Sequence, residues 1–248
     1  MNVQLIDYTG AGSADPARHA ANVLVFTKST RLNMQPGLMD EIAAKPWSEI
    51  EAELEYMANT IPSSWEFVTY TFLINGVTRA FTHQFVRTRT GSYAQQTMRV
   101  LDVDGWDYLT GPTIASDPNR QASYDRAMAL VDDEYRRQIA NGAKIEDARG
   151  ILPTNILTNI VAKFDLRTFS DTQRKRASSR TQGEYRDVMD AMRAEVLRVH
   201  PWASMFLERT FDKSAAELEA EITRLKHMVG EIRMTDMIKL IDQMRMTA

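Results

Sequence analysis

The sequence has 248 residues, a formal net charge of −3, 44% hydrophobic residues and 25% charged residues, which is the composition of an ordinary globular protein. No apolar run approaches the roughly 20 residues of a membrane-spanning helix, and no signal-peptide pattern opens the chain, so we expect a cytoplasmic protein that makes no membrane contact. The absence of cysteine excludes disulfides, thiolate metal ligands and a thiolate nucleophile, and the four histidines lack the i, i+4 spacing of a zinc site.

Two helices are predicted in the first 60 residues. Asp15 can cap a helix in which Pro16 takes the first position, where a missing N–H costs nothing, and this helix should reach Thr30. A second helix is predicted after Pro46, because apolar residues then recur at helical spacing. These residues are Ile50, Leu54 and Met57.

A strand, a helix and a second strand are predicted next. Aromatic and β-branched residues alternate from Ile61 to Ile74, which predicts a strand buried on both faces. Asn75-Gly76 predicts a turn, after which Val77 to Thr88 returns to helical spacing. Gly91 should end that helix, and Ser92 to Val103 then predicts another strand.

The second half of the chain is predicted to be largely helical. Asp117-Pro118 should open a long helix that runs to Ala140 and is closed by Asn141-Gly142. Near the C-terminus, Ser214 and Glu217 form a capping box, and apolar residues then follow a 4, 3, 4, 3 spacing. This coiled-coil-like seam, which should pack on its own domain or on a neighbouring subunit, consists of Leu218, Ile222, Leu225, Val229 and Ile232.

Positive charge is concentrated in two windows of the sequence. The window from Arg79 to Arg99 contains four arginines and no acid, and the window from Lys163 to Arg186 contains seven basic and three acidic residues. Each window has a net charge of +4, so the rest of the chain carries −11. The small total charge argues against bulk electrostatic binding to nucleic acid. We infer one shared anion site.

The first window contains the residues RTRTGSYAQQTMR, from Arg87 to Arg99, and this frame resembles the signature RHRxxSxNExSxR of the flavin-dependent thymidylate synthases, the ThyX family. Four positions match the signature, and Thr97 replaces a serine. The matching residues are Arg87, Arg89, Ser92 and Arg99. His, Asn and Glu of the signature are replaced here by Thr88, Ala94 and Gln95.

Other segments extend the resemblance to roughly residues 45–210. Glu66, Arg79 and Gln84 occupy family-like positions before the signature. The segment ARGILPTN, from Ala148, resembles the family's ARxxLP, and RASSRTQGEYRD, from Arg176, resembles RxxxHAQxEIR. Ile61 stands where the family has a histidine.

The resemblance implies an α+β fold with a central antiparallel sheet flanked by long helices, with residues 1–212 as the catalytic domain and residues 213–248 as a C-terminal helical extension. It also implies a homotetramer with sites between subunits, FAD as cofactor, NADPH as reductant and methylenetetrahydrofolate as carbon donor. The absent cysteine agrees with this family, because reduced flavin chemistry needs no protein nucleophile.

The resemblance assigns site residues as well. Arg176 and Arg99 are the expected catalytic residues, since guanidinium groups can stabilise negative charge on a pyrimidine ring. The expected substrate-binding residues are Gln84, Arg87, Gln95, Thr97, Arg99, Arg149 and Arg176. The expected cofactor-binding residues are Arg87, Thr88, Arg89, Gln95, Asp165, Arg167, Asp171 and Arg180. The two aspartates stand where the family more often has asparagine, and they could accept hydrogen bonds from adenine or ribose or orient Arg167 and Arg174.

The expected activity is C5 methylation of UMP or dUMP. Ala94 and Gln95 are smaller and neutral replacements beside the expected ribose position, so discrimination against a 2′-hydroxyl could be relaxed. A family branch that methylates UMP in polyoxin-type antibiotic biosynthesis is similar in these departures. The alternatives are a uridylate hydroxymethylase with the same donor, and a non-catalytic homologue that binds nucleotides or RNA.

Overall fold

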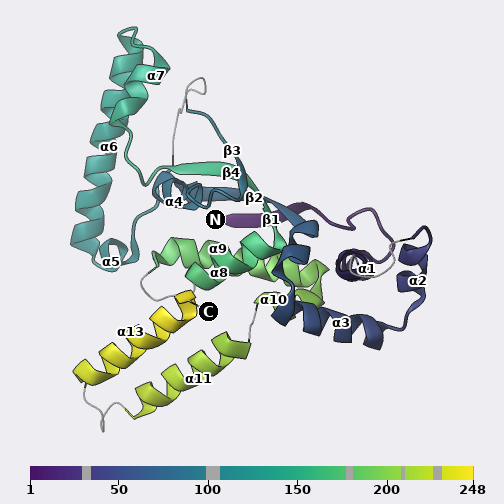
Figure 1. Cartoon of the computed structure of the whole chain (residues 1–248). Helices are drawn as coiled ribbons and strands as arrows, with labels where there is room; N and C mark the ends of the chain where they lie inside the picture. The colour runs from purple at the N-terminus through teal and green to yellow at the C-terminus, as the bar shows by residue number, and fades with distance from the viewer. Residues whose placement is uncertain (30–34, 99–106, 177–180, 208–209, 226–230, 248) are drawn as a thin grey trace. The chain divides into compact units, whose positions relative to one another are not determined.

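The computed structural model describes residues 1–29, 35–98, 107–176, 181–207, 210–225 and 231–247 (Figure 1). The chain divides into two compact units. The first unit contains Met1–Gln4 and Leu73–Ala162, and the second contains Leu5–Phe72 and Lys163–Ala248. The predicted boundary between residues 212 and 213 stays a prediction.

A four-stranded sheet has the strand order β1-β2-β4-β3. The strands are β1 (Asn2–Tyr8), β2 (Thr69–Thr78), β3 (Ser92–Gln95) and β4 (Leu157–Asp165). The backbone N–H of Thr9 donates to the carbonyl of Thr69, and that of Leu166 donates to the carbonyl of Val68, so β2 runs antiparallel to both neighbours. The predicted α+β fold with an antiparallel sheet is confirmed.

Strand β2 differs from the sequence prediction at both ends. Pro62–Phe67 forms a 3-10 helix, η2, so the strand begins only at Thr69. The turn predicted at Asn75-Gly76 is wrong, because the strand continues through Gly76 with a φ of +66°. The N–H of Gly76 donates 3.1 Å to the Oδ1 atom of Asn159, so a side chain replaces a ladder bond there.

Buried and half-buried residues alternate along most of β2, so one face of the strand is buried and the other is partly exposed. Tyr70, Phe72 and Ile74 have no exposed surface, whereas Thr69 and Leu73 are half-buried. The prediction of a strand buried on both faces is therefore wrong for the single chain. The alternation is that of a strand with one face in a core.

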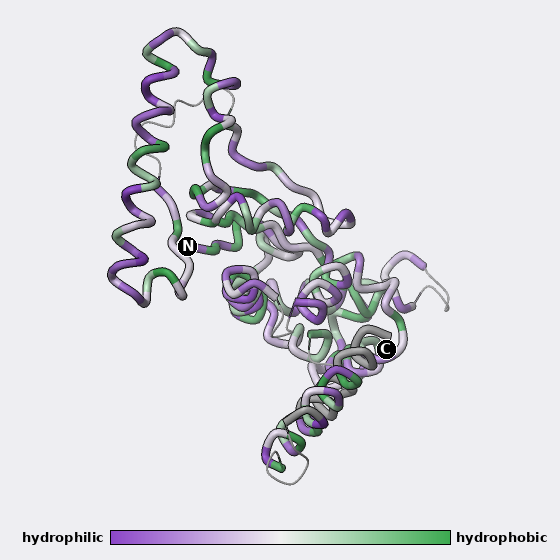
Figure 2. The backbone as a smooth tube through the Cα atoms, turned by 90° about the vertical axis from the view of Figure 1, so that its left-hand side faces the viewer, coloured by the Kyte–Doolittle hydropathy of each residue, from purple (hydrophilic) through white to green (hydrophobic). Residues whose placement is uncertain are grey.

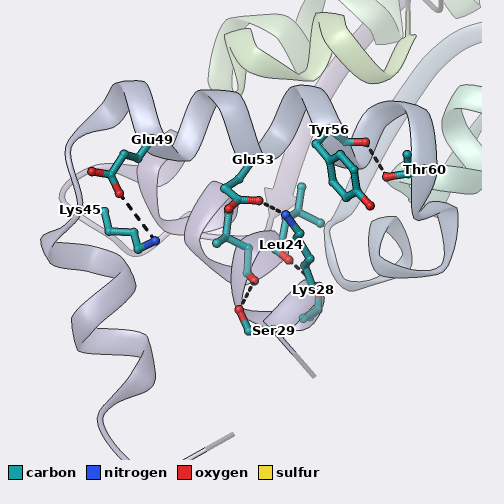
Figure 3. A network of polar contacts seen from close by, with 10 residues as sticks. Leu24, Lys28, Ser29, Lys45, Glu49, Glu53, Tyr56 and Thr60 are labelled. Atoms are coloured by element: carbon teal, nitrogen blue, oxygen red, sulfur yellow. Dashed lines mark hydrogen bonds and ion pairs between the residues drawn. The ribbon is translucent and has the colours of Figure 1, made fainter. Parts of the chain in front are cut away.

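Helices α1 (Pro16–Lys28), α2 (Leu38–Ala44) and α3 (Trp47–Thr60) lie in the N-terminal part of the second unit. The predicted cap of α1 is confirmed, because an Asp15 carboxylate oxygen accepts from the N–H of Arg18 at 2.9 Å. Lys28 pairs with Glu53 between α1 and α3, and its ammonium lies 4.4 Å from the centroid of the Tyr56 ring (Figure 3). Surface pairs of this kind contribute little, so the predicted apolar stripe of α3, which is buried, makes the stronger contact.

An aromatic core joins the rest of the second unit. Its helices are α8 (Leu166–Arg176), α9 (Gly183–Val199), η4 (Pro201–Ala203) and α10 (Ser204–Leu207). Phe169 of α8 packs on Phe72 and Phe164, and the indole of Trp65 packs edge-on against Phe206 at 5.0 Å. Buried aromatic pairs add to the stability that area burial gives, which fixes α8 on the sheet residues of this unit.

The helices of the first unit are α4 (Arg79–Phe85), α5 (Pro112–Ala115), α6 (Pro118–Ala140), α7 (Ile145–Ala148) and η3 (Arg149–Ile151). The predicted bounds of α6 are confirmed, with Asp117 as N-cap and Gly142 at a φ of +87°. Hydrophilic residues dominate α6 along its length (Figure 2), and only Met128 and Tyr135 are buried. Helix α4 ends at Phe85, three residues before the predicted Thr88.

The described residues of the C-terminal region include helices α11 (Thr210–Arg224) and α13 (Glu231–Thr247), so the predicted seam is not one continuous helix, because α11 ends at Arg224. The helices pack against each other, and Ile222 and Ile241 form a small core with Met234 and Ile238. The predicted capping box is wrong, because α11 begins four residues before Ser214. Val229 of the predicted seam lies outside the described residues, and Leu218 is half exposed.

None of the helices in the described parts of the chain has the length and apolar composition needed to cross a membrane.

Candidate functional site

The turn after α4 has a fixed backbone. The Oγ1 atom of Thr78 accepts from the N–H of Phe81 at the start of α4, and Phe81 stacks on Phe85 with ring centroids 4.9 Å apart. Beyond the helix, the hydroxyl of Tyr93 donates 2.8 Å to the carbonyl of Thr88, and its ring packs edge-on against Phe85. The predicted helix-to-strand junction is thus confirmed as helix, turn and strand β3.

Arg87 and Arg89 extend from this turn into solvent. Both side chains are exposed, and neither forms an ion pair with any other residue that the structure describes. Because a guanidinium can donate two parallel hydrogen bonds to a phosphate or carboxylate, the pair is available to an anionic ligand. Gln84 and Thr88, also expected in the site, are half-buried beside them.

Arg79 and Arg149 bring two positive charges together in the first unit. Arg79 is half-buried at the start of α4, and its Nη2 atom donates 3.3 Å to the carbonyl of Gln96. Burial, and then the charge of Arg149, hold the pKa of Arg79 below its usual value. The Nε atom of Arg79 is buried without a hydrogen-bond partner among the described residues. Two like charges and an unsatisfied donor favour the binding of an anion between them.

Gln95 is tied to the helix that precedes the turn. Its Nε2 atom donates 2.9 Å to the Oγ1 atom of Thr82, and the Thr82 hydroxyl donates 3.1 Å to the carbonyl of Arg79. A hydroxyl has one hydrogen, so Thr82 must accept from residue 95. An amide satisfies this bond while the hydroxyl keeps donating to Arg79, whereas a carboxylate could be satisfied only if the hydroxyl turned away from Arg79 to donate to it. The neutral residue at position 95 therefore matches its buried neighbour.

The acidic residues of the second window are already engaged. The two carboxylate oxygens of Asp165 accept from the backbone N–H of Thr168 at 2.7 Å and from its hydroxyl at 3.0 Å, so Asp165 caps α8. Asp171 pairs with Arg174 at 3.6 Å, which is one of the roles expected for it. Arg167 pairs instead with Glu66, at 2.7 Å, and both side chains are exposed.

Arg176 is the last residue of α8 and lies over an aromatic ring. Its guanidinium carbon is 4.5 Å from the centroid of Tyr185, a fully buried residue of α9. The sequence patterns did not single out Tyr185, because a stacking partner nine residues away on the next helix follows no helix or strand period.

The remaining expected residues are distributed as follows. Arg149 begins η3, and its Nε atom donates to the carbonyl of Glu146; Thr97 is exposed just beyond β3. Arg99 and Arg180 lie outside the described residues. The structure describes Gln84 to Thr97 and Arg149 within the first unit, and Asp165 to Arg176 within the second. The shared site of the two windows stays a prediction.

Comparisons with known proteins give a consistent result. A family model described as "Thymidylate synthase complementing protein" matches residues 4–202. The chain is 34% identical over 152 residues to a flavin-dependent thymidylate synthase of Clostridium tetani, covering 55% of this chain and 61% of that protein. A protein of the same name from Sulfurisphaera tokodaii is 30% identical over 206 residues, covering 81% of this chain and 75% of the relative. A third, from Nitratidesulfovibrio vulgaris, is 35% identical over 158 residues, covering 58% of this chain and 64% of the relative. The chain thus spans less than two thirds of the length of the first and third of these relatives.

Proposed function

Because the chain belongs to the thymidylate synthase complementing protein family, we propose that it is a flavin-dependent methylase acting on C5 of a uridine monophosphate. The proposed carbon donor is methylenetetrahydrofolate, and NADPH is the proposed reductant of FAD. The match to the family model over residues 4–202 agrees with the resemblance that the arginine-rich signature indicates. The lack of cysteine supports flavin chemistry, since no thiolate is available to attack the pyrimidine.

The observation that carries the proposal is the half-buried guanidinium of Arg79, whose Nε atom has no hydrogen-bond partner among the described residues and whose pKa is lowered by burial and then by the charge of Arg149. Burial and mutual repulsion make these guanidinium groups unfavourable neighbours unless an anion lies between them. A nucleotide monophosphate supplies such an anion and accepts charge-assisted hydrogen bonds from both residues. Arg87, on the adjacent turn, adds a third cation.

The proposed substrates are UMP and dUMP together. The hydrogen bond from Gln95 to Thr82 supports a neutral residue where the family signature has a carboxylate. A neutral amide leaves no fixed negative charge beside the sugar, and Ala94 leaves space next to it. Both differences favour tolerance of a 2′-hydroxyl.

The donor set fits FAD. Arg87 and Arg89 are exposed and have no ion-pair partner among the described residues, so they can hold the pyrophosphate together with Thr88. Asp171 has a compensating cation in Arg174, whereas Asp165 is engaged as the cap of α8 by the neutral donors of Thr168. Arg167, which pairs with Glu66, would bind the cofactor by exchanging that carboxylate for a cofactor oxygen. When bound, reduced FAD supplies the hydride that converts the transferred carbon unit to a methyl group.

The chain's own residues supply binding and charge stabilisation. Arg176 and Arg99 would stabilise negative charge that develops on the uracil ring, while Gln84, Gln95 and Thr97 would orient the nucleotide. Hydrogen bonds that strengthen as this charge grows lower the barrier of the chemical step. Asp165 would hold the start of α8, and thereby Arg167, in place for the cofactor.

Further parts of the proposal rest on the resemblance. These are a homotetramer with sites between subunits, a cytoplasmic location, a catalytic domain of residues 1–212 with residues 213–248 as an extension, and a similarity to the UMP methylase of polyoxin-type antibiotic biosynthesis.

The test is a flavin measurement followed by turnover. Purified protein should be yellow or should take up added FAD. Anaerobic reaction with reduced flavin and methylenetetrahydrofolate, with UMP and dUMP in parallel, should give a product with one added methyl group by mass spectrometry. Arg176→Ala should weaken nucleotide binding by roughly 10- to 100-fold with unchanged helicity, as expected for one lost charge-assisted hydrogen-bond pair.

Three results would contradict the proposal. A colourless protein that takes up no FAD would exclude a flavin enzyme and leave the non-catalytic nucleotide- or RNA-binding homologue. A hydroxymethyl product would identify the hydroxymethylase. Flavin binding with inertness to both nucleotides would exclude uridylates as substrates.

A further inference from the structure

The contact between Arg176 and Tyr185 joins the end of α8 to the first turn of α9. The guanidinium carbon lies 4.5 Å from the ring centroid, within the range of a cation–π interaction. Arg176 is half-buried, and among the residues that the structure describes it forms no ion pair. Among the described residues, the aromatic ring is therefore the contact that restrains the guanidinium of Arg176.

Tyr185 is a rigid platform for the guanidinium. It has no exposed surface, and it lies on the buried side of α9 with Val188, Met189 and Met192. A close-packed core keeps such a ring in one rotamer. An arginine at a helix end has many rotamers, and stacking on a fixed ring selects a few of them before any ligand arrives.

Stacking leaves the useful part of the guanidinium free. The contact with the ring uses one flat face of the group, whereas its N–H donors point outward in the plane. An anion can therefore accept two parallel hydrogen bonds from the edge while the face stays on Tyr185. A flexible lysine could not reproduce this arrangement.

We propose that Tyr185 is a positioning residue that holds Arg176 by cation–π stacking, so that its N–H edge is presented to the anionic or carbonyl oxygens of the uridine nucleotide. This inference rests on the proposed function, in which Arg176 contacts the substrate. The segment RxxxHAQxEIR, which resembles residues 176–186, has isoleucine at this place, and isoleucine has no aromatic face. The restraint is thus a property of this chain's own sequence.

The variants Y185I, Y185F and V188A separate positioning from core packing. Y185I introduces the residue of the resembling segment and so is suited to the fold, which circular dichroism and thermal melting check. Calorimetry with UMP and with dUMP should show about tenfold weaker binding for Y185I, the size of an intermediate cation–π contact. Y185F keeps the aromatic face and should restore the affinity to within about twofold of wild type. V188A removes core volume on the same helix and keeps the aromatic ring on which Arg176 lies.

A double-mutant cycle with Arg176 provides the decisive measurement. If Tyr185 acts through Arg176, Y185I should cause no further loss of affinity in the R176A background. Additive losses, or an equal loss in V188A, would overturn the positioning role while leaving the proposed function intact. Wild-type protein that binds neither nucleotide would overturn both proposals.

Discussion

His200 should make the folded chain sensitive to mild acid. The imidazole has no exposed surface, its Nδ1 atom is 2.9 Å from the hydroxyl of Tyr70, and its ring stacks on Trp202. Burial lowers the pKa of His200 to about 4, against an ordinary value of 6.5. The histidine is thus neutral in the folded chain at pH values where the unfolded chain protonates it.

The pH window and the magnitude follow from this difference. Above about pH 6.5 the group is neutral in both states, and its contribution to stability is complete. As the pH falls from 6.5 to 4, the unfolded chain gains a proton that the folded chain does not bind. The free energy of unfolding should then fall by about 3 kcal/mol, since each pKa unit corresponds to roughly 1.4 kcal/mol.

Urea unfolding between pH 7.5 and 4, compared with H200Q, measures this effect. Glutamine can still bond to the hydroxyl of Tyr70 but does not titrate in this range. The wild-type minus variant difference in unfolding free energy should therefore decrease steadily below pH 6.5. A difference that stays constant across this range would refute the assignment of a buried, neutral His200.

Three further substitutions test other parts of the structure. R149M removes a charge that lowers the pKa of Arg79, so the melting temperature without ligand should not fall. The rise in melting temperature caused by added UMP should be largely lost. An unchanged rise with UMP would contradict the anion site. T82V removes the hydroxyl that accepts a hydrogen bond from Gln95, and it should change the ratio of UMP to dUMP affinity measured by calorimetry. T82S keeps the hydroxyl and should keep the ratio. The same ratio in T82V and wild type would exclude a link between this hydrogen bond and the choice of sugar. G76A forces a side chain into a φ of +66° and should lower the unfolding free energy by about 1–2 kcal/mol in a urea titration, with G111A, in open space, as the control; equal losses would contradict backbone strain.

Helix ends with local signals could be predicted from the sequence. Asp15 with Pro16 and Asp117 with Pro118 carry the start signal within adjacent residues, and the structure has both helices there. The turn predicted at Asn75-Gly76 was wrong, because this dipeptide occurs both in turns and in strands where the glycine has a positive φ, as Gly76 does here. The choice depends on Asn159, more than 80 residues away, whose side chain accepts the hydrogen bond of Gly76.

The candidate site was predictable in residue type but not in geometry. The acid-free window around Arg87 indicated an anion site, because charge excess is visible in sequence. The engagement of Asp165 as a helix cap depends on where α8 begins, and the pairing of Arg167 with Glu66 joins segments 101 residues apart. Neither follows from periodicity or composition.

The fixed turn between α4 and β3 decides which part of the chain must become ordered when a ligand binds. The hydroxyl of Tyr93 already holds the carbonyl of Thr88, so the backbone between the two arginines keeps its conformation. Within this turn, the exposed side chains of Arg87 and Arg89 are what loses freedom, about 2 kcal/mol each at most. Loss of the Tyr93 hydroxyl should therefore weaken ligand binding through added disorder, although that atom is bonded to the protein's own backbone.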